Sequence, residues 1–372
     1  MKTICFVINS LGTGGAERML LKLVKSTSEN YNYQIITLLN NHDLSSEISH
    51  LDIPIVSLDI KKRKGIIKRT KKVIGILSES DLIHSWLYHS DLFSFIFGKI
   101  LLKKKIIWNI RHTNLSKKHN KKSTLLLVKI NSILSKYVDK IVYCSHSSYN
   151  SHKVAGYKNG NSFVIPNGFD VKRFNLIPKN NIFKELRLDF PVKNNQKILL
   201  TIGRYHSLKG YDILMESMAQ WKDENFLLLM VGRNIDDNNQ ELKEYIRKAN
   251  VNFEKIKLLG ERNDVEKLLS IADLFILSSI SEGFPNVLGE AVFSKVFSIT
   301  TDAGDAGYIL KNKDWIVPCE NPKSLGLKIK NYFSLSESER DSIINENYKF
   351  VKNNYEMSIV SSRYNEIHSD II

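Results

Sequence analysis

Short apolar runs alternate with amphipathic stretches along most of the chain. In the first half, runs that predict buried strands cover residues 2–8, 34–39, 53–58, 82–84, 106–110, 140–144 and 163–165. Most of the intervals between them have helical periodicity. Residues 16–28, for example, place five apolar side chains on one helical face, namely Ala16, Met19, Leu20, Leu23 and Val24. Strands that alternate with helices in this way predict an open parallel sheet.

The same pattern returns in the second half, after a polar interval. Residues 172–196 are polar and are expected to link two domains, and the strands predicted beyond them cover residues 197–202, 226–231, 256–259, 274–277 and 296–300. A chain of 372 residues is too long for one ordinary core. We therefore expect two α/β domains, residues 1–175 and 176–350, and a helical segment over residues 351–372.

The loop that follows the predicted strand 274–277 carries two glutamates. Serine, glycine and proline break the chain there, and Asn286 is predicted to be the N-cap of the next helix. Loops at the carboxyl ends of parallel strands form ligand crevices, and a helix N-terminus in such a loop attracts phosphate. Glu282 and Glu290 could bind hydroxyl groups on either side of that anion, as in a sugar nucleotide. The alternative is that Glu282 caps the loop and Glu290 is solvated.

Two more glycine loops follow predicted strands. In the loop over residues 203–210, Arg204 can fork onto phosphate oxygens and Lys209 adds a point charge, so that together they could neutralise a diphosphate. A basic surface loop is the alternative. The loop over residues 12–15 hints at a dinucleotide fingerprint, but position 17 is glutamate and the next strand ends without a carboxylate for a ribose. This argues against NAD.

Positive charge is concentrated in the first half. The net charge of the chain is +15, and residues 1–175 hold 28 Lys/Arg and 11 Asp/Glu, a net charge of +17. Basic clusters occur at residues 61–72, 103–105 and 117–122. Such clusters favour anionic membrane surfaces or nucleic acid, although a solvated face is the alternative. The basic runs lack interleaved aromatic residues that could stack on bases, so we expect no nucleic-acid partner.

Metal, disulfide and membrane-spanning signals are weak. The three cysteines, Cys5, Cys144 and Cys319, are far apart and form no C-x-x-C pair, and neither a D-x-D sequence nor a His/Cys cluster with metal-ligand spacing occurs. No apolar run reaches the 18 or so residues that span a bilayer. We therefore expect no metal and no cofactor, buried thiols, and a cytoplasmic protein.

Four segments carry a family resemblance. They are G-T-G-G-A-E-R at 12–18, V-I-P-N-G-F-D-V-K-R-F at 164–174, G-R-x-x-x-x-K-G at 203–210 and E-G-F-P-N-x-x-x-E at 282–290. In this order they resemble the motifs of retaining glycosyltransferases of the family 4 type, which build bacterial surface polysaccharides. The resemblance implies the GT-B fold, an α/β architecture of two Rossmann-like parallel-sheet domains facing each other across a cleft. It also implies that the first domain binds the acceptor, that the second binds the nucleotide sugar, and that residues 351–372 cross back to the first domain.

The resemblance assigns roles to particular residues. Catalytic roles fall to Glu282, His112, Arg204 and Lys209, with Arg111 and His84 as weaker candidates beside His112. Substrate binding is implied for Gly14, Gly15, Gly203, Gly232, Arg233, Leu259, Glu261, Gly283, Phe284, Pro285, Asn286, Val287 and Glu290.

The implied reaction moves a hexose or N-acetylhexosamine from a nucleotide diphosphate sugar, with UDP expected as the nucleotide, to a glycan acceptor in surface polysaccharide or lipopolysaccharide assembly. The acceptor is expected on a polyprenyl-pyrophosphate lipid at the inner face of the cell membrane. Catalysis is expected to be metal-independent. The alternatives are a sugar-nucleotide epimerase of the same fold and a basic membrane- or nucleic-acid-binding module.

Overall fold

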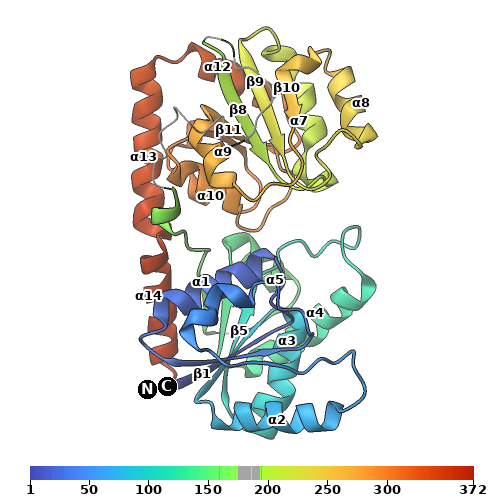
Figure 1. Cartoon of the computed structure of the whole chain (residues 1–372), viewed down its shortest axis with the longest axis vertical. Helices are drawn as coiled ribbons and strands as arrows, with labels where there is room; N and C mark the ends of the chain where they lie inside the picture. The colour runs from blue at the N-terminus through green and yellow to red at the C-terminus, as the bar shows by residue number, and fades with distance from the viewer. Residues whose placement is uncertain (159, 175–185, 187–192, 194) are drawn as a thin grey trace. The chain divides into compact units, whose positions relative to one another are not determined.

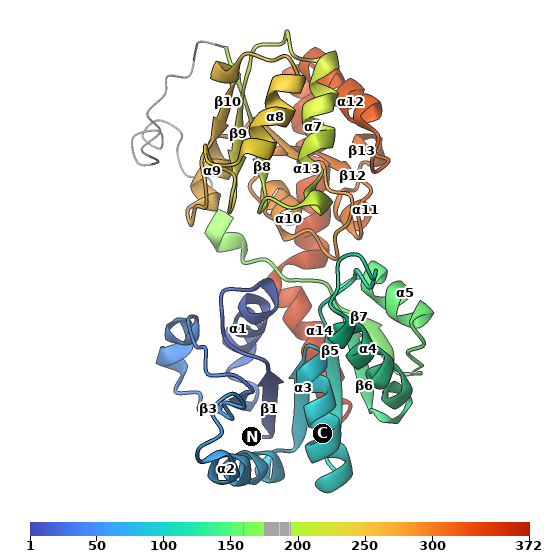
Figure 2. The same cartoon turned by 90° about the vertical axis from the view of Figure 1, so that its right-hand side faces the viewer.

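The computed structural model describes residues 1–372 except 159, 175–185, 187–192 and 194. The chain folds into two compact units (Figures 1 and 2). Unit 1 comprises Met1–Gly168 and Met357–Ile372, and unit 2 comprises Phe169–Glu356. The sequence had suggested a division at residue 175. Most of the expected linker 172–196 lies outside the described residues.

Unit 1 contains a seven-stranded parallel sheet with the strand order β3-β2-β1-β4-β5-β6-β7. Its strands are β1 Thr3–Ile8, β2 Asn32–Thr37, β3 Ile55–Ser57, β4 Leu82–Trp86, β5 Lys105–Ile110, β6 Lys140–Tyr143 and β7 Ser162–Val164. Its longer helices are α1 Gly15–Thr27, α2 Ile66–Glu79, α3 Tyr88–Phe93, the π-helix η2 Ser94–Leu101, α4 Lys122–Leu134, α5 His146–Val154 and α14 Met357–Ser369. Short 3-10 turns cover η1 Ser45–Leu51 and η3 Ser135–Tyr137.

Both faces of this sheet are buried, which explains why its strands read as continuous apolar runs. In β1, Ile4, Phe6 and Ile8 pack in a core with α1 and α14, whereas Cys5 and Val7 pack in a second core with α2, η2 and α4. Alternate residues of a strand point to opposite faces, so one apolar run supplies both cores.

Unit 2 contains a six-stranded parallel sheet with the order β10-β9-β8-β11-β12-β13. Its strands are β8 Lys197–Ile202, β9 Phe226–Val231, β10 Ile256–Leu258, β11 Leu274–Leu277, β12 Phe297–Thr301 and β13 Ile316–Val317. Its α-helices are α7 Tyr211–Ser217, α8 Gln240–Lys248, α9 Val265–Ile271, α10 Asn286–Phe293, α11 Ala306–Ile309, α12 Pro322–Ser334 and α13 Glu337–Tyr355. The 3-10 turns are η4 Val171–Phe174, η6 Ser207–Lys209, η7 Met218–Gln220, η8 Phe253–Lys255 and η9 Lys313–Trp315.

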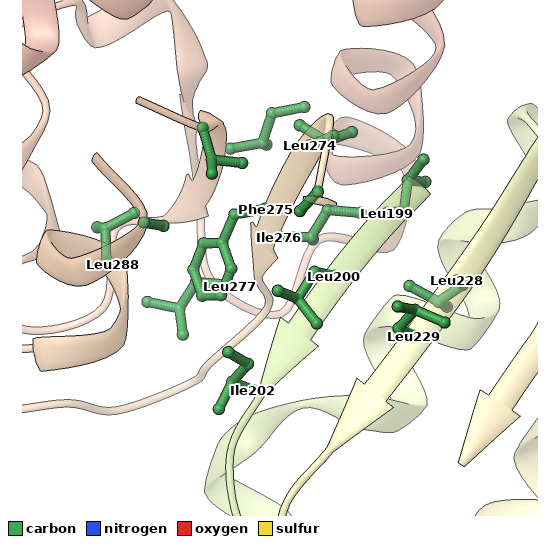
Figure 3. Packing of buried hydrophobic residues seen from close by; sticks show 14 of the residues in the cluster. Leu199, Leu200, Ile202, Leu228, Leu229, Leu274, Phe275, Ile276, Leu277 and Leu288 are labelled. Atoms are coloured by element: carbon green, nitrogen blue, oxygen red, sulfur yellow. The ribbon is translucent and has the colours of Figure 1, made fainter. Parts of the chain in front are cut away.

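The core of unit 2 is one apolar cluster around the central strands. Figure 3 shows aliphatic side chains of β8, β9 and β11 packed side by side, with Leu288 of α10 beside Phe275 and Leu277 of β11. Thus the helix that follows the β11 loop is anchored through its buried face. The two parallel sheets and the helices that alternate with their strands confirm the predicted α/β fold class.

The chain returns to unit 1 near its end. The amide of Phe169 donates to the carbonyl of Tyr355 at 2.9 Å, and Phe169 forms a β-bridge with Glu356, so the two connecting segments are hydrogen-bonded to each other. Helix α13 ends there, and α14 packs against α1. The crossing therefore begins at Met357 and not at 351. Within the residues that the structure describes, none of the helices is both long enough and apolar enough to span a bilayer.

Candidate functional site

The candidate site lies in unit 2, where the order of the strands reverses direction. Strands β8 and β11 are neighbours in the sheet although β9 and β10 lie between them in sequence, and Leu274 pairs with Leu199. Ligands of open α/β sheets bind outside the carboxyl ends of the strands at such a switch point. The loops that leave β8 and β11 are those that contain Lys209 and Glu282.

These two loops are fastened together by backbone contacts. The Ile280 amide donates to the Leu208 carbonyl at 2.8 Å, and the Ser278 hydroxyl donates to the Lys209 carbonyl at 3.0 Å. Gly210 has φ +61°, and a Cβ on it would lie 2.2 Å from the Ser278 carbonyl oxygen. Only glycine combines this conformation with so close an approach. The position of Lys209 is therefore fixed by the neighbouring loop.

The Glu282 carboxylate is the centre of the site. Its Oε1 accepts from Lys209 Nζ and from Ser279 Oγ, both at 2.6 Å. The side chains of Lys209 and Glu282 are 21% and 14% exposed, so the pair is largely shielded but reachable from solvent. Tyr211 donates to the Gly203 carbonyl at 2.6 Å, and burial, followed by the charge of Glu282, raises the pKa of its hydroxyl. A partly desolvated carboxylate and ammonium of this kind can bind hydroxyl and phosphate groups.

The end of β12 and the loop after it hold the Glu282 loop in place. Thr301, at the end of β12, donates to the Ser279 carbonyl at 2.5 Å, and the Asp305 amide donates to the Gly283 carbonyl at 2.9 Å. Gly304 has φ +62°, and a Cβ there would meet the Glu282 carbonyl oxygen at 2.2 Å. Sequence reasoning gave no role to Ser279, Thr301 or Gly304. The glycine-rich character of residues 302–307 was the one available signal.

Helix α10 begins directly after this loop. Its N-cap is Pro285, whose side chain cannot accept a hydrogen bond, and Asn286 is the first helical residue. The prediction that Asn286 is the N-cap was therefore wrong by one residue, because the turn places Pro285 in the extended conformation that precedes the helix. The first turn of α10 carries the partial positive charge that favours an anion. Half-buried Glu290 lies in this helix, while Phe284 is buried against Phe169.

The other predicted contacts in unit 2 lie on neighbouring loops. Gly203 is close to the loop after β9, because a Cβ on Gly232, at φ +149°, would lie 2.0 Å from its carbonyl oxygen. The Gly232 amide in turn donates to the carbonyl of Gly260, next to half-buried Leu259, at 2.8 Å. Five predicted residues thus share one edge of the sheet with Lys209 and Glu282, namely Gly203, Gly232, Arg233, Leu259 and Glu261.

The charged residues on these loops are more exposed. Arg233 forms two hydrogen bonds of 3.3 Å with Glu261, and their side chains are 64% and 61% exposed. The pair bridges the loops after β9 and β10. Arg204 is exposed and available to a ligand. Gly283 and Val287, which complete the predicted set, flank Phe284 and Asn286 and are half-buried.

The predicted residues of unit 1 lie at the carboxyl edge of its own sheet. Gly14 and Gly15 begin α1, and a Cβ on Gly14 would lie 2.3 Å from Glu17 Oε2. The side chain of Glu17 therefore folds over the start of its own helix, and burial raises its pKa. His112 is half-buried, and its Nε2 is 3.1 Å from Asn120 Oδ1, which fixes the orientation of the ring.

The two weaker candidates, Arg111 and His84, lie in different environments. Arg111 lies over the ring of Trp86, with 4.8 Å from Cζ to the centroid, and donates to Asn167. His84 was a wrong candidate, because it lies inside β4 with 0% exposure and its Nδ1 is 2.9 Å from Nε2 of His368 in α14. Burial, and then the charges of His368 and Arg111, lower the pKa of His84 well below its usual value. It stabilises the docking of α14 and does not face a ligand.

The part of the chain that the structure describes contains no group of three or more His, Cys, Asp or Glu side chains arranged to hold a metal ion. The positive groups at the site are instead Lys209, Arg204 and the start of α10.

Comparisons with known proteins match both halves of the chain and the fold. Two families match the two halves of the chain: the one described as "Glycosyltransferase Family 4" matches residues 13–173, and "Glycosyl transferases group 1" matches residues 183–350. One similar solved structure is that of Anabaena HepE in complex with UDP and glucose, with 19% sequence identity, full coverage of both chains and a TM-score of 0.82. A glycosyltransferase from Rickettsia africae is 23% identical with a TM-score of 0.81, over 100% of this chain and 98% of that one.

Two of the similar proteins of known activity act on lipid-linked sugars. A Campylobacter jejuni protein is 24% identical over 81% of each chain and is an N-acetylgalactosamine-N,N'-diacetylbacillosaminyl-diphospho-undecaprenol 4-alpha-N-acetylgalactosaminyltransferase. A UDP-Gal:alpha-D-GlcNAc-diphosphoundecaprenol alpha-1,3-galactosyltransferase of Escherichia coli is 28% identical, over 40% of this chain and 39% of that protein.

Proposed function

The chain belongs to the GT-B glycosyltransferases of the family 4 type, and from this premise we propose a specific reaction. In this reaction the protein transfers a hexose or N-acetylhexosamine from a UDP-sugar to a glycan on a polyprenyl diphosphate, with retention of the anomeric configuration. Two similar enzymes are named for reactions with a diphospho-undecaprenol acceptor, and this supports the choice of acceptor. We place the reaction at the inner face of the cell membrane, in surface polysaccharide assembly.

The observation that carries this proposal is the Lys209–Glu282 pair beside the start of α10. The Lys209 ammonium has three N–H donors, so it can keep its 2.6 Å contact with Glu282 and still donate to a diphosphate oxygen. The exposed guanidinium of Arg204 and the partial positive charge of the α10 N-terminus would take the remaining phosphate charge. Glu282 is then next to the sugar, and Glu290 is assigned to the ribose hydroxyls.

In the proposed reaction these groups replace a metal ion. The bond between C1 of the sugar and the β-phosphate oxygen breaks, and the acceptor oxygen forms a bond to C1 from the same face. The acceptor proton moves to the departing phosphate oxygen. Lys209 and Arg204 stabilise the negative charge on that phosphate, and Glu282 stabilises the positively charged sugar ring. His112 is assigned to a sugar hydroxyl.

Labelled UDP-sugars incubated with a polyprenyl-diphosphate-linked sugar test this function. We expect label to move to the lipid only when the acceptor is present, with an α-linked product from an α-linked donor. EDTA is expected to change the rate by less than about twofold, because the positive side chains supply the charge. A donor sugar that changes configuration without acceptor would identify an epimerase instead. Loss of activity with EDTA, restored by a divalent cation, would contradict metal-independent catalysis.

A further inference from the structure

Unit 1 exposes an unusual number of large apolar side chains. Fifteen large hydrophobic residues are exposed among those that the structure describes, and twelve of them lie in unit 1. Nine of the twelve lie on α2, η2, α4 and η3 or in the segment that leads into α2: Ile60, Ile67, Ile96, Ile100, Leu101, Leu126, Ile130, Ile133 and Tyr137. Exposed apolar residues scattered singly need no explanation, but a group of this size on one face does.

The elements that carry these residues lie side by side. The ring of Phe95 in η2 is 6.5 Å from the ring of Tyr137 in η3, directly after α4. Lys99 of η2 is bound to Asp139 at 2.6 Å, and α2 contacts η2 from the other side. The buried faces of all three helices share one core. Their outer faces therefore form one continuous surface, which we call the α2–η2–α4 surface.

Helix α4 exposes large apolar side chains on its outer face. Leu127 and Val128 are buried in the core, yet Leu126, Ile130 and Ile133, spaced by four and three residues, are 60%, 38% and 61% exposed. That spacing places all three on one side of the helix. A surface helix normally has polar residues there. The outer face of α4 therefore carries three large apolar side chains where a helix that faces only water would carry polar ones.

Positive charge surrounds these apolar side chains. Residues 60–138 hold 19 Lys/Arg against three Asp/Glu, a net charge of +16, while the rest of the chain has a net charge of −1. Of the three acidic residues, Asp91 is buried, and burial raises its pKa well above the usual value, while Asp81 is bound to Lys2. Lys129 and Lys136 are exposed within and directly after α4. The surface therefore combines apolar side chains with a large excess of positive charge.

We propose that the α2–η2–α4 surface docks on an anionic lipid bilayer, with the apolar side chains of η2 and α4 inserted among the acyl chains and the lysines at the phosphate level. Insertion of apolar side chains and attraction to anionic headgroups are the two terms of interfacial binding, and this surface supplies both. The inference extends the proposed function, because it gives an enzyme with a lipid-linked acceptor a defined contact with the membrane.

Vesicle sedimentation of the full chain tests the surface. We expect binding to vesicles of phosphatidylglycerol and phosphatidylcholine, and weak binding to phosphatidylcholine alone. The double variant Leu126→Ser/Ile133→Ser should bind the anionic vesicles about 100-fold more weakly, roughly tenfold for each side chain removed. Lys129→Gln/Lys136→Gln should weaken binding about fivefold for each charge and should reduce its dependence on salt.

The matched control is Leu327→Ser, which removes a side chain of α12 in unit 2 that is 47% exposed. It should leave vesicle binding unchanged. Equal binding by the wild type and the Leu126→Ser/Ile133→Ser variant would overturn the proposal, as would a stable dimer of the wild type without lipid that the same variant dissociates. UDP binding in solution separates the two inferences. A protein that binds vesicles but no nucleotide keeps the docking surface and loses the proposed function.

Discussion

Glu282→Gln is expected to lower the rate of sugar transfer by about 10²–10³-fold, the size of effect seen when one transition-state contact is removed. The amide is nearly the same size and can still accept from Ser279, which now donates to the carboxylate at 2.6 Å. What it loses is the negative charge opposite the positively charged sugar ring. Lys209 stays available to the diphosphate, so UDP binding should change by less than about threefold. The measurement is kcat and KM for transfer to a short, water-soluble acceptor.

The matched control for this variant is Asp139→Asn in unit 1. Lys99 and Asp139 form a pair of the same 2.6 Å length, with side chains 29% and 16% exposed, but Asp139 lies before β6 at the amino edge of the sheet. Both variants should lose a similar amount of stability, since each breaks a half-buried ion pair. Only Glu282→Gln should lose transfer. Comparable losses of activity in the two variants would mean that Glu282 acts through folding and not through the substrate.

Gly210→Ala is expected to destabilise unit 2 by about 3 kcal/mol and to abolish most of the transfer activity. The added Cβ would meet the Ser278 carbonyl oxygen at 2.2 Å, so the loops after β8 and β11 must move apart and carry Lys209 away from Glu282. The measurement is urea unfolding by tryptophan fluorescence, together with the transfer rate.

Gly260→Ala shows how much of the stability lost in Gly210→Ala comes from the backbone conformation and how much from the close contact with the neighbouring loop. Gly260 has φ +68°, close to the +61° of Gly210, but a Cβ there would have nothing within 4 Å. The cost should therefore be only the conformational one, about 1 kcal/mol. If the two alanine variants unfold at the same urea concentration, the close approach of the two loops contributes nothing to stability.

The sequence was a good guide to the strands and a poorer one to contacts between loops. Buried parallel strands need apolar side chains on both faces, so their bounds could be predicted within about three residues from apolar runs alone. Strand β13, Ile316–Val317, has only two residues and left no such run. The return of the chain at Met357 depends on the pairing of Phe169 with Glu356, which no local pattern indicates.

The residues of the site were likewise predicted well where they stand in a motif and poorly where they depend on contacts between loops. Lys209 and Glu282 stand in recognisable motifs, but Thr301 and Gly304 gain their roles only because the end of β12 and the loop after it meet the β11 loop in space. That meeting depends on the strand order, which a single sequence does not specify. His84 illustrates the opposite error. It was a weaker candidate at the end of a predicted strand, and it is buried against His368, which is 284 residues away along the chain.

The most direct test of the account is the binding of UDP, GDP, ADP and dTDP to the wild type and to Lys209→Met by calorimetry. Methionine keeps the hydrocarbon stem that packs near Gly203 and removes the charge. We predict that the wild type binds UDP in preference to the other three and that Lys209→Met binds it about 100-fold more weakly, because a charged contact to the diphosphate is lost. Unchanged UDP binding by Lys209→Met, or a wild type that binds none of the four nucleotides, would contradict the claim that these loops form a nucleotide-sugar site.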